Sequence, residues 1–394
     1  MTGLLDSATP HLHPRRRRSP RRSMLARFVA PVVLAVLVAG GCSAPSATAP
    51  RDDAATAPIS QVALSDLDVV ESPRDYVGES TAVLPNAAIT PVQESPEQRL
   101  PSTVTSNDLG GEREVTVGDT SRVVTLDMSG SIAATVWGLG FGDTLVGRDQ
   151  STSFPGVQDL PVVTSGGHTI NAESVIGLAP TLVITDGSVG PRDVVEQLRD
   201  VGITVVFVAN DPSFAGAEQL AHDVADVFGA PEAGDALAQQ ISADVQRTVD
   251  DIAAIAPTED GERLRMVFLY LRGSAGVYYL FGDESGADDL IGALGGVDVA
   301  GELGWDGMKP LTDEAMVAAD PDLILVMSKG LESVGGVDGL LADKPAIALT
   351  SAGEHRRFVD MEDGQILSFG PRSAALLDAL ARAVYAPAAS GSTS

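Results

Sequence analysis

The chain has 394 residues, of which 44% are hydrophobic, and a formal net charge of −28 at pH 7. This composition is typical of a folded chain with room for two domains, and the negative charge disfavours nucleic acid or an anionic membrane surface as a partner. The single cysteine, Cys42, excludes a framework of disulfides.

Residues 1–41 have the pattern of a secretory signal peptide. Seven arginines precede an apolar run from Phe28 to Val38, which is too short for a stable membrane span. Three small residues, Ala39 to Gly41, then lead to Cys42. This ending resembles a bacterial lipobox, and the resemblance implies cleavage before Cys42 and lipidation of its thiol. An ordinary export signal with an incidental cysteine is the alternative.

Residues 42–111 are rich in alanine, proline, serine, threonine and acids, without sustained hydrophobic periodicity. Such a segment cannot bury enough apolar surface to offset the loss of chain entropy on folding. We therefore predict a disordered tether between the lipidated end and the folded body.

Residues 112–229 predict a first α/β lobe. Strand patterns alternate with helical ones, with strands at 114–117, 122–126, 144–147, 160–163, 182–185 and 204–208, and helices at 132–139, 172–178, 194–201 and 214–228. This alternation is typical of a parallel sheet covered by helices. Ligands of such sheets bind beside the loops that follow the strands, and Arg148 and His168 lie in loops of this kind.

Residues 230–257 predict one long helix that joins this lobe to a second one. Apolar residues recur at spacings of three and four from Leu237 to Ile255, Pro231 suits the first turn, and Pro257 ends the pattern. At 1.5 Å per residue the helix would be roughly 35–40 Å long, about the width of a small domain. A helix of that length between two α/β units predicts two lobes with a cleft between them.

Residues 258–388 predict the second lobe, with strands at 264–270, 276–281, 323–326 and 357–359 and helices at 287–294, 313–319, 337–341 and 374–385. The predicted fold class is α/β, with two Rossmann-like lobes joined by one backbone helix.

A short repeat relates the two lobes. Glu173 stands seven residues before Pro180, and Glu314 stands seven residues before Pro321, each in a pattern of helix, proline turn and buried strand. The repeat indicates two variants of one design. The alternative is that both glutamates are simply first-turn acids that favour the helix dipole.

Three side chains suggest a binding site. His168 follows two glycines, which let the backbone place its ring in a cleft. Tyr270 and Arg272 end a strand two positions apart and so share a face. A guanidinium beside a phenol favours phenolate, a hard donor that suits ferric iron, whereas a core tyrosine beside a surface arginine is the alternative. We interpret His222, inside a helix, and His355, in a charged turn, as structural or solvated.

Sequence patterns of other site types are missing. The sequence has no histidine and cysteine spacing for a metal cluster, no GxxxxGK[ST] phosphate loop, no GxGxxG after the first strand and no GxSxG at a strand–helix turn. An enzyme is therefore disfavoured.

The export signal, the two lobes, the long helix and the Glu–Pro repeat together resemble the helix-spined (class III) periplasmic-type solute-binding proteins of iron-complex and cobalamin ABC importers. Three motifs resemble the haem-binding lipoproteins of that family: Gly167-His168-Thr169, Phe268-Leu269-Tyr270-Leu271-Arg272-Gly273 and Phe369-Gly370-Pro371-Arg372. The resemblance implies haem (hemin) as the transported ligand. It also implies an ABC permease with its ATPase, and upstream haem-donor proteins, as partners.

Residue roles follow from the same resemblance. His168 and Tyr270 would be the two axial ligands of ferric haem, one from each lobe, and Arg272 would hydrogen-bond the Tyr270 oxygen. A ferric siderophore or a corrinoid is the alternative ligand, and a surface adhesion or sensor module is the alternative function.

Further positions are expected to line the pocket or to meet the importer. Arg148, Trp305 and Met308 are candidates for the haem pocket. Glu173 and Glu314 match the positions at which such proteins dock on arginines of the permease.

Overall fold

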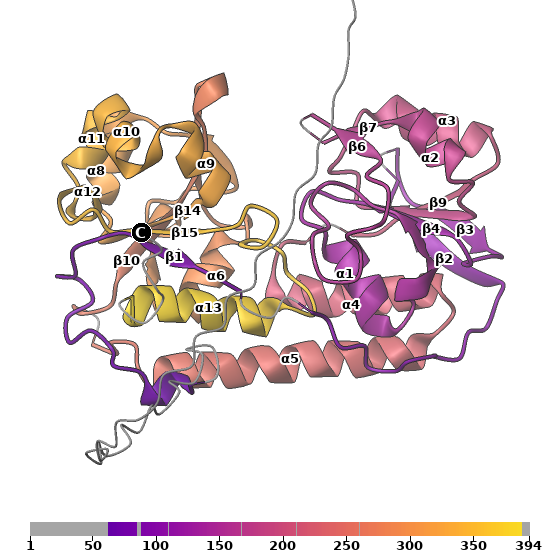
Figure 1. The fold of residues 1–394 in the computed structure, drawn as a ribbon, viewed down its shortest axis with the longest axis horizontal. Coiled ribbons are helices and arrows are strands. Elements are labelled where there is room, and N and C mark those ends of the chain that lie inside the picture. Colours follow the sequence, from indigo (N-terminus) through magenta and orange to yellow (C-terminus); the bar gives the residue numbers. More distant parts are fainter. Residues whose placement is uncertain are drawn as a thin grey trace, which may run out of the picture. The chain divides into compact units, whose positions relative to one another are not determined.

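The long helix α5 (Pro231–Ala253) connects two α/β lobes, and this part of the prediction is confirmed. It begins with a proline in its first turn, beside Glu232, where an acid favours the helix dipole. Its buried apolar face, which includes Leu237, packs against α4 (Phe214–Val227) of the first lobe and α13 (Ser373–Tyr385) of the second. Figure 1 shows α5 running beneath both of these helices.

The computed structural model describes residues 62–84, 88–108, 110–166, 168–209, 211–259 and 261–387. The chain divides into Met1–Ala54 and Ala55–Ser394, and every described residue belongs to the second unit. The predicted signal peptide, Cys42 and Gly167 lie outside the described residues. Within these ranges, no helix combines the length and the apolarity of a membrane span, and no group of three or more histidine, cysteine or acidic side chains is placed to hold a metal ion.

The first lobe is built on a parallel sheet with the strand order β5-β4-β8-β9. Its central strands β4 and β8 are buried at every residue, as expected for a sheet with helices on both faces. Its elements are β2 (Ser102–Ser106), β3 (Arg113–Val117), β4 (Val123–Leu126), α1 (Ser131–Leu139), η3 (Gly142–Thr144), β5 (Leu145–Gly147), β6 (Thr164–Ser165), β7 (Thr169–Ile170), α2 (Ala172–Gly177), β8 (Leu182–Thr185), α3 (Arg192–Asp200), β9 (Thr204–Phe207) and α4.

The second lobe is built on a mixed sheet with the order β1-β15-β14-β10-β11-β13, and β12 pairs with β10. Strands β1, β15, β14 and β10 are parallel, whereas β11 is antiparallel to both of its neighbours. Its elements are β10 (Arg265–Arg272), η4 (Gly273–Ala275), β11 (Val277–Phe281), α6 (Ala287–Ala293), β12 (Val297–Asp298), α7 (Val299–Glu302), β13 (Met308–Pro310), α8 (Asp313–Ala319), β14 (Leu323–Met327), α9 (Ser328–Ser333), α10 (Gly336–Asp343), α11 (Pro345–Ala348), α12 (Ser351–Glu354), β15 (Phe358–Met361) and α13.

The Glu–Pro repeat has the same geometry in both lobes. Asn171 caps α2 by accepting a hydrogen bond from the amide of Ser174, and Thr312 caps α8 in the same way. Each helix is followed by a residue with positive φ, Ala179 at 47° and Asp320 at 36°, directly before the proline and the buried strand. Such angles are uncommon for residues with a Cβ atom, so their occurrence at matching positions supports two copies of one design.

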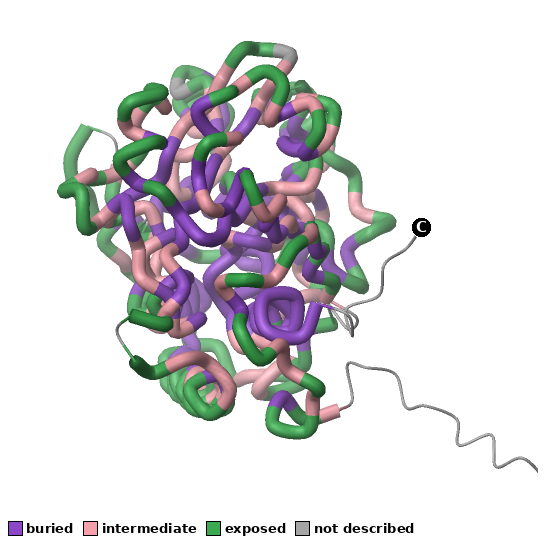
Figure 2. Tube along the Cα trace, turned by 90° about the vertical axis from the view of Figure 1, so that its left-hand side faces the viewer, coloured by how far each residue is buried: buried purple, intermediate pink, exposed green. Residues whose placement is uncertain are grey.

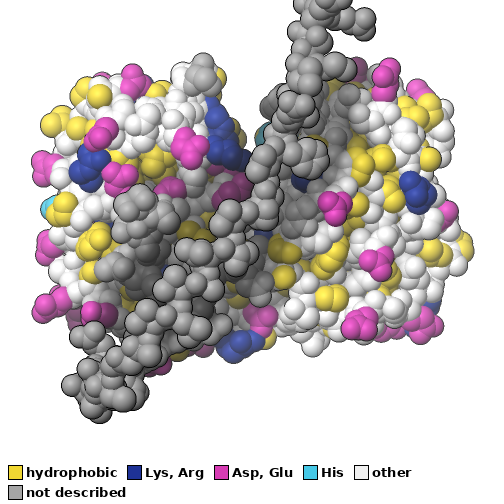
Figure 3. Space-filling model, viewed as in Figure 1, with side chains coloured by type: hydrophobic (Ala, Val, Ile, Leu, Met, Phe, Trp, Pro, Cys, Tyr) yellow, Lys and Arg dark blue, Asp and Glu magenta, His cyan; other side chains and the backbone are white. Residues whose placement is uncertain are grey.

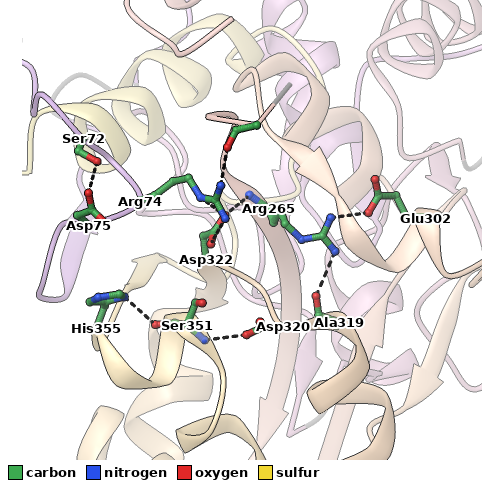
Figure 4. A network of polar contacts seen from close by, with 11 residues as sticks. Ser72, Arg74, Asp75, Arg265, Glu302, Ala319, Asp320, Asp322, Ser351 and His355 are labelled. Carbon is green, nitrogen blue, oxygen red and sulfur yellow. Dashed lines mark hydrogen bonds and ion pairs between the residues drawn. The ribbon is translucent and has the colours of Figure 1, made fainter. Parts of the chain in front are cut away.

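Residues 42–111 are not a disordered tether where the structure describes them, so this prediction is wrong for residues 62–84 and 88–108. We call these two ranges the N-terminal strap. Its first range contains η2 (Leu64–Asp66) and β1 (Ser80–Ala82), and β1 pairs with the edge strand β15 of the second lobe. Arg74 forms an ion pair with Asp322, 3.0 Å apart, and donates a hydrogen bond to the carbonyl of Gly261 (Figure 4).

The second range of the strap lies on the first lobe. The amide of Val92 donates a hydrogen bond to the carbonyl of Gly138, and the amide of Arg99 donates one to the carbonyl of Gly229. Gly140, with φ at 99°, is needed here because a Cβ atom would collide with the carbonyl oxygen of Gln93. Strand β2 then pairs with β3 in a separate two-stranded sheet. The two predicted strands at 114–117 and 122–126 therefore lie in different sheets.

Buried residues, purple in Figure 2, gather toward the middle of the molecule. They include every residue of β4 and β8 and the apolar face of α5. One apolar cluster runs from the first lobe through α5 and α13 to one face of the second sheet, and a separate cluster fills the other face of that sheet. Acidic side chains are spread over the face that Figure 3 shows, in keeping with the net charge of −28.

Candidate functional site

His168 lies at the tip of a β-hairpin in the first lobe. The hairpin pairs β6 with β7, in the loop region that precedes α2. His168 has φ at 64°, a left-handed conformation that costs on the order of 1 kcal/mol for a residue with a Cβ atom. Its ring is partly buried, and Nδ1 is enclosed without a hydrogen-bond partner among the described residues. Strain and an unpaired nitrogen at one position indicate a functional side chain.

The imidazole of His168 is biased toward its neutral form. Burial lowers its pKa, and the positive charge of Arg272 lowers it further. Because Arg272 belongs to β10, this electrostatic interaction links the hairpin of the first lobe to the end of β10 in the second lobe. Neutral imidazole is the form that binds a metal ion.

Tyr270 lies on the face of β10 that belongs to the cluster shared with the first lobe. Met266 and Phe268 point to the same cluster, whereas the alternating residues Val267, Leu269 and Leu271 fill the other face. The Tyr270 ring is half-buried and stacks on Phe281 of β11, with ring centroids 5.9 Å apart at 20°. Strand alternation therefore places the phenol where the sequence pattern predicted it.

Arg272 covers the ring of Tyr270. Its guanidinium carbon lies 4.5 Å from the ring centroid. It donates hydrogen bonds to the carbonyl of Leu271 at 2.7 Å and to Oδ2 of Asp363 at 2.9 Å, and Oδ1 of Asp363 accepts one from the amide of Lys329. A hydrogen bond to the Tyr270 oxygen, which the resemblance implied, is not among the contacts of Arg272 in the described part of the chain. Asp363 instead holds the cation over the face of the ring.

Three aspartates at the strand ends of the first lobe were not predicted as a group. Asp127 follows β4, Asp149 follows β5 and Asp186 follows β8. The amide of Asp127 donates to Oδ2 of Asp149, 3.1 Å away. Burial raises the pKa of Asp127 well above its usual value, and the neighbouring charges of Asp149 and Asp186 raise it further. The sequence signal for this group is that each aspartate follows a strand. Their burial depends on the tertiary structure and could not be predicted from the sequence.

The three predicted pocket residues have different surroundings. Arg148 donates to the carbonyl of Thr152 at 2.8 Å, so its guanidinium braces its own loop. Trp305 packs against the cluster on the face of the sheet opposite Tyr270. Met308 lies directly across from Phe281 in the β13–β11 pair, on the same face as Tyr270, and is 62% exposed.

The remaining predicted residues lie elsewhere. Glu173 and Glu314 are exposed in the first turns of α2 and α8. His222 contacts Asp235 at 3.4 Å, and His355 contacts the carbonyl of Ser351 at 3.1 Å (Figure 4).

Two α/β lobes joined by one long helix define the class of two-lobed solute-binding proteins. Residues 123–363 match the family model described as "Periplasmic binding protein", and the chain belongs to this family. The resemblance to solute-binding proteins of ABC importers is confirmed.

Similar proteins have been described. The crystal structure of the heme binding protein HmuT aligns with a TM-score of 0.73 and 40% identity, over 80% of this chain and 99% of that one. An uncharacterized ABC transporter substrate-binding lipoprotein, YvrC of Bacillus subtilis strain 168, is 27% identical over 256 residues, which are 63% of this chain and 76% of YvrC. A cobalamin-binding protein of Halobacterium salinarum strain R1 is 28% identical over 278 residues, which are 68% of this chain and 70% of that protein.

Proposed function

We propose that this protein captures haem between its two lobes and delivers it to an ABC importer, without catalysing a reaction itself. The observation that carries this proposal is a strained histidine of the first lobe whose pKa is lowered by Arg272 of the second lobe, the same residue that covers the ring of Tyr270. The similarity to HmuT, which is greater in identity than the similarity to the cobalamin-binding protein, supports haem over a corrinoid.

In this proposal His168 and Tyr270 are the axial ligands of ferric haem. Imidazole and phenolate are both known haem ligands, and one ligand from each lobe would clamp a flat ring from its two sides. Solved HmuT variants have a histidine, a tyrosine or an arginine replaced by alanine, and the tyrosine and arginine are two positions apart. Tyr270 and Arg272 have the same spacing.

The neighbours of this pair fit a porphyrin. Phe281 and the exposed Met308 would supply apolar surface beside Tyr270, and Asp363 would keep Arg272 in place. Arg148 and Trp305 are bound to their own loop and core cluster, so we leave them out of the proposed contact surface.

The test is a titration of the purified mature chain with hemin, followed by absorbance. We expect a sharp, saturable Soret band with one-to-one stoichiometry. If only the broad spectrum of free hemin is seen, haem is the wrong ligand. The same protein would then be titrated with a corrinoid and a ferric siderophore.

We further propose that Cys42 anchors the protein by its lipid and that Glu173 and Glu314 contact arginines of the permease. Reversing both glutamates to lysine should abolish hemin import by cells while the hemin titration is unchanged, because both side chains are exposed to solvent and neither belongs to the proposed haem contacts. Asp251→Lys, an exposed acid on α5, is the control for charge alone. Normal import by the double glutamate variant would contradict the docking assignment.

Cys42→Ala should lower import by releasing the protein from cells.

A further inference from the structure

The segment Phe369 to Arg372 is a joint at which the second lobe touches the first. The ring of Phe369 meets that of Phe214 edge to face, with centroids 5.1 Å apart. Pro371 packs so closely on α1 that a Cβ atom added at Gly138 would lie 2.9 Å from its Cγ. Arg372 ends the motif Phe369-Gly370-Pro371-Arg372 and directly follows Pro371.

Arg372 is a buried cation without a hydrogen-bond partner in the part of the chain that the structure describes. It is 5% exposed, and Nε, Nη1 and Nη2 are all enclosed and unpaired among the described residues. Its guanidinium carbon lies 5.6 Å from the ring centroid of Phe154, in the first lobe. Burial lowers the pKa of Arg372, and the charge of Glu362 offsets this only in part. An enclosed guanidinium with unsatisfied donors destabilises a fold and calls for a function.

Other buried arginines show how unusual this is. Arg382, on helix α13, which Arg372 precedes directly, donates to both carboxylate oxygens of Asp378, at 2.7 and 2.9 Å. Arg357 donates to Ser80 and to the carbonyls of Ala383 and Val384. Each of these two guanidinium groups thus makes at least two hydrogen bonds, although Nε of Arg357 is also unpaired, whereas all three nitrogens of Arg372 lack a partner among the described residues.

The guanidinium of Arg372 interacts with two loops, each of which follows the carboxyl end of a sheet strand. Phe154 is in the loop that follows β5, and Glu362 is in the loop that follows β15. These loops touch, since a Cβ atom added at Gly364 would lie 2.9 Å from the carbonyl oxygen of Ser151. The second loop also carries Asp363, which holds Arg272. Loops at the carboxyl ends of parallel strands are where α/β sheets bind their ligands.

We propose that Arg372 binds a carboxylate of the ligand when these two loops separate. The inference rests on the proposed function, in which this carboxylate is a propionate of haem. A guanidinium binds a carboxylate with two parallel hydrogen bonds. One propionate would therefore supply acceptors for Arg372 nitrogens that have none in the unliganded protein. The unpaired cation in the unliganded protein would then favour the loaded state, because only the ligand satisfies it.

The experiment compares hemin with hemin dimethyl ester, in which both propionates are uncharged esters. For Arg372→Met we expect hemin affinity to fall roughly 10- to 100-fold, the loss typical of a charge-assisted hydrogen-bonded pair. Affinity for the dimethyl ester should be unchanged. Arg372→Lys, which keeps the charge but not the paired donors, should lose less hemin affinity than Arg372→Met.

A fold control separates binding from packing. The melting temperature of unliganded Arg372→Met should equal or exceed that of the unmodified protein, because an unpaired buried charge is removed, whereas Arg382→Met should melt lower. If Arg372→Met does not fold, the affinities of Arg372→Lys for hemin and for hemin dimethyl ester are compared instead.

Three outcomes overturn the inference. Equal losses for hemin and its dimethyl ester would assign Arg372 to lobe packing instead. Unchanged hemin affinity in Arg372→Met would exclude any contact with the ligand. If the unmodified protein does not bind hemin at all, the proposed function fails, and the propionate assignment fails with it.

Discussion

Tyr270→Phe is expected to weaken hemin binding by at least about 100-fold, more than the loss typical of groups that only support a metal ligand. The substitution removes the phenol oxygen and keeps the ring that stacks on Phe281. His168→Ala should weaken binding less, because imidazole is neutral whereas phenolate also neutralises charge on ferric iron. Hemin titrations followed at the Soret band measure both effects.

Tyr278→Phe is the matched control for Tyr270→Phe. It removes one phenol oxygen from the neighbouring strand, but Tyr278 packs against the cluster on the opposite face of the sheet and donates to Asp343 at 2.6 Å. We expect hemin affinity to be unchanged in this variant. Equal affinities for Tyr270→Phe, His168→Ala and Tyr278→Phe would rule out axial ligation by the first two residues.

The features that could be predicted from the sequence depend on local pattern. The helix over α5 follows from apolar residues at spacings of three and four, with prolines at both ends of the pattern. The Glu–Pro repeat predicted two related lobes, and the matching caps and positive φ angles show the same local geometry twice. Tyr270 and Arg272 share a face simply because strand residues two positions apart do so.

The features that could not be predicted depend on partners far away in the sequence. Arg272 was expected to meet the phenol oxygen, but Asp363, 91 residues later, holds it over the ring instead. Arg382 has a local signal in Asp378, four residues earlier on the same helix, whereas nothing in the local sequence indicates that Arg372 is buried without a partner among the described residues. The N-terminal strap has a disorder-like composition, and its order comes from pairing with β15 and from contacts with helices of both lobes. Such stabilisation has no local signature.

Arg357 is the residue that best tests what holds the strap on the second lobe. It is fully buried, and it joins Ser80 of β1 to the carbonyls of Ala383 and Val384 at the end of α13. Its guanidinium carbon also lies 4.8 Å from the ring centroid of Tyr76, in the strap. The cation thus caps a helix end, where the dipole favours positive charge, and fastens the strap to it.

Arg357→Met is expected to lower the free energy of unfolding by about 3 kcal/mol, because it removes the donor to the buried carbonyl of Val384 and one of the two donors to the carbonyl of Ala383, whose other donor is Ser80 Oγ. It should also expose residues 62–84 to limited proteolysis. Arg356→Met is the matched control: this neighbour is partly exposed and pairs with Glu79 and Asp338 on the surface, where ion pairs contribute little. Chemical denaturation and protease digestion measure the two effects. If Arg357→Met unfolds and is cleaved like Arg356→Met, backbone pairing between β1 and β15 is sufficient to hold the strap, and the buried cation is not what fastens it.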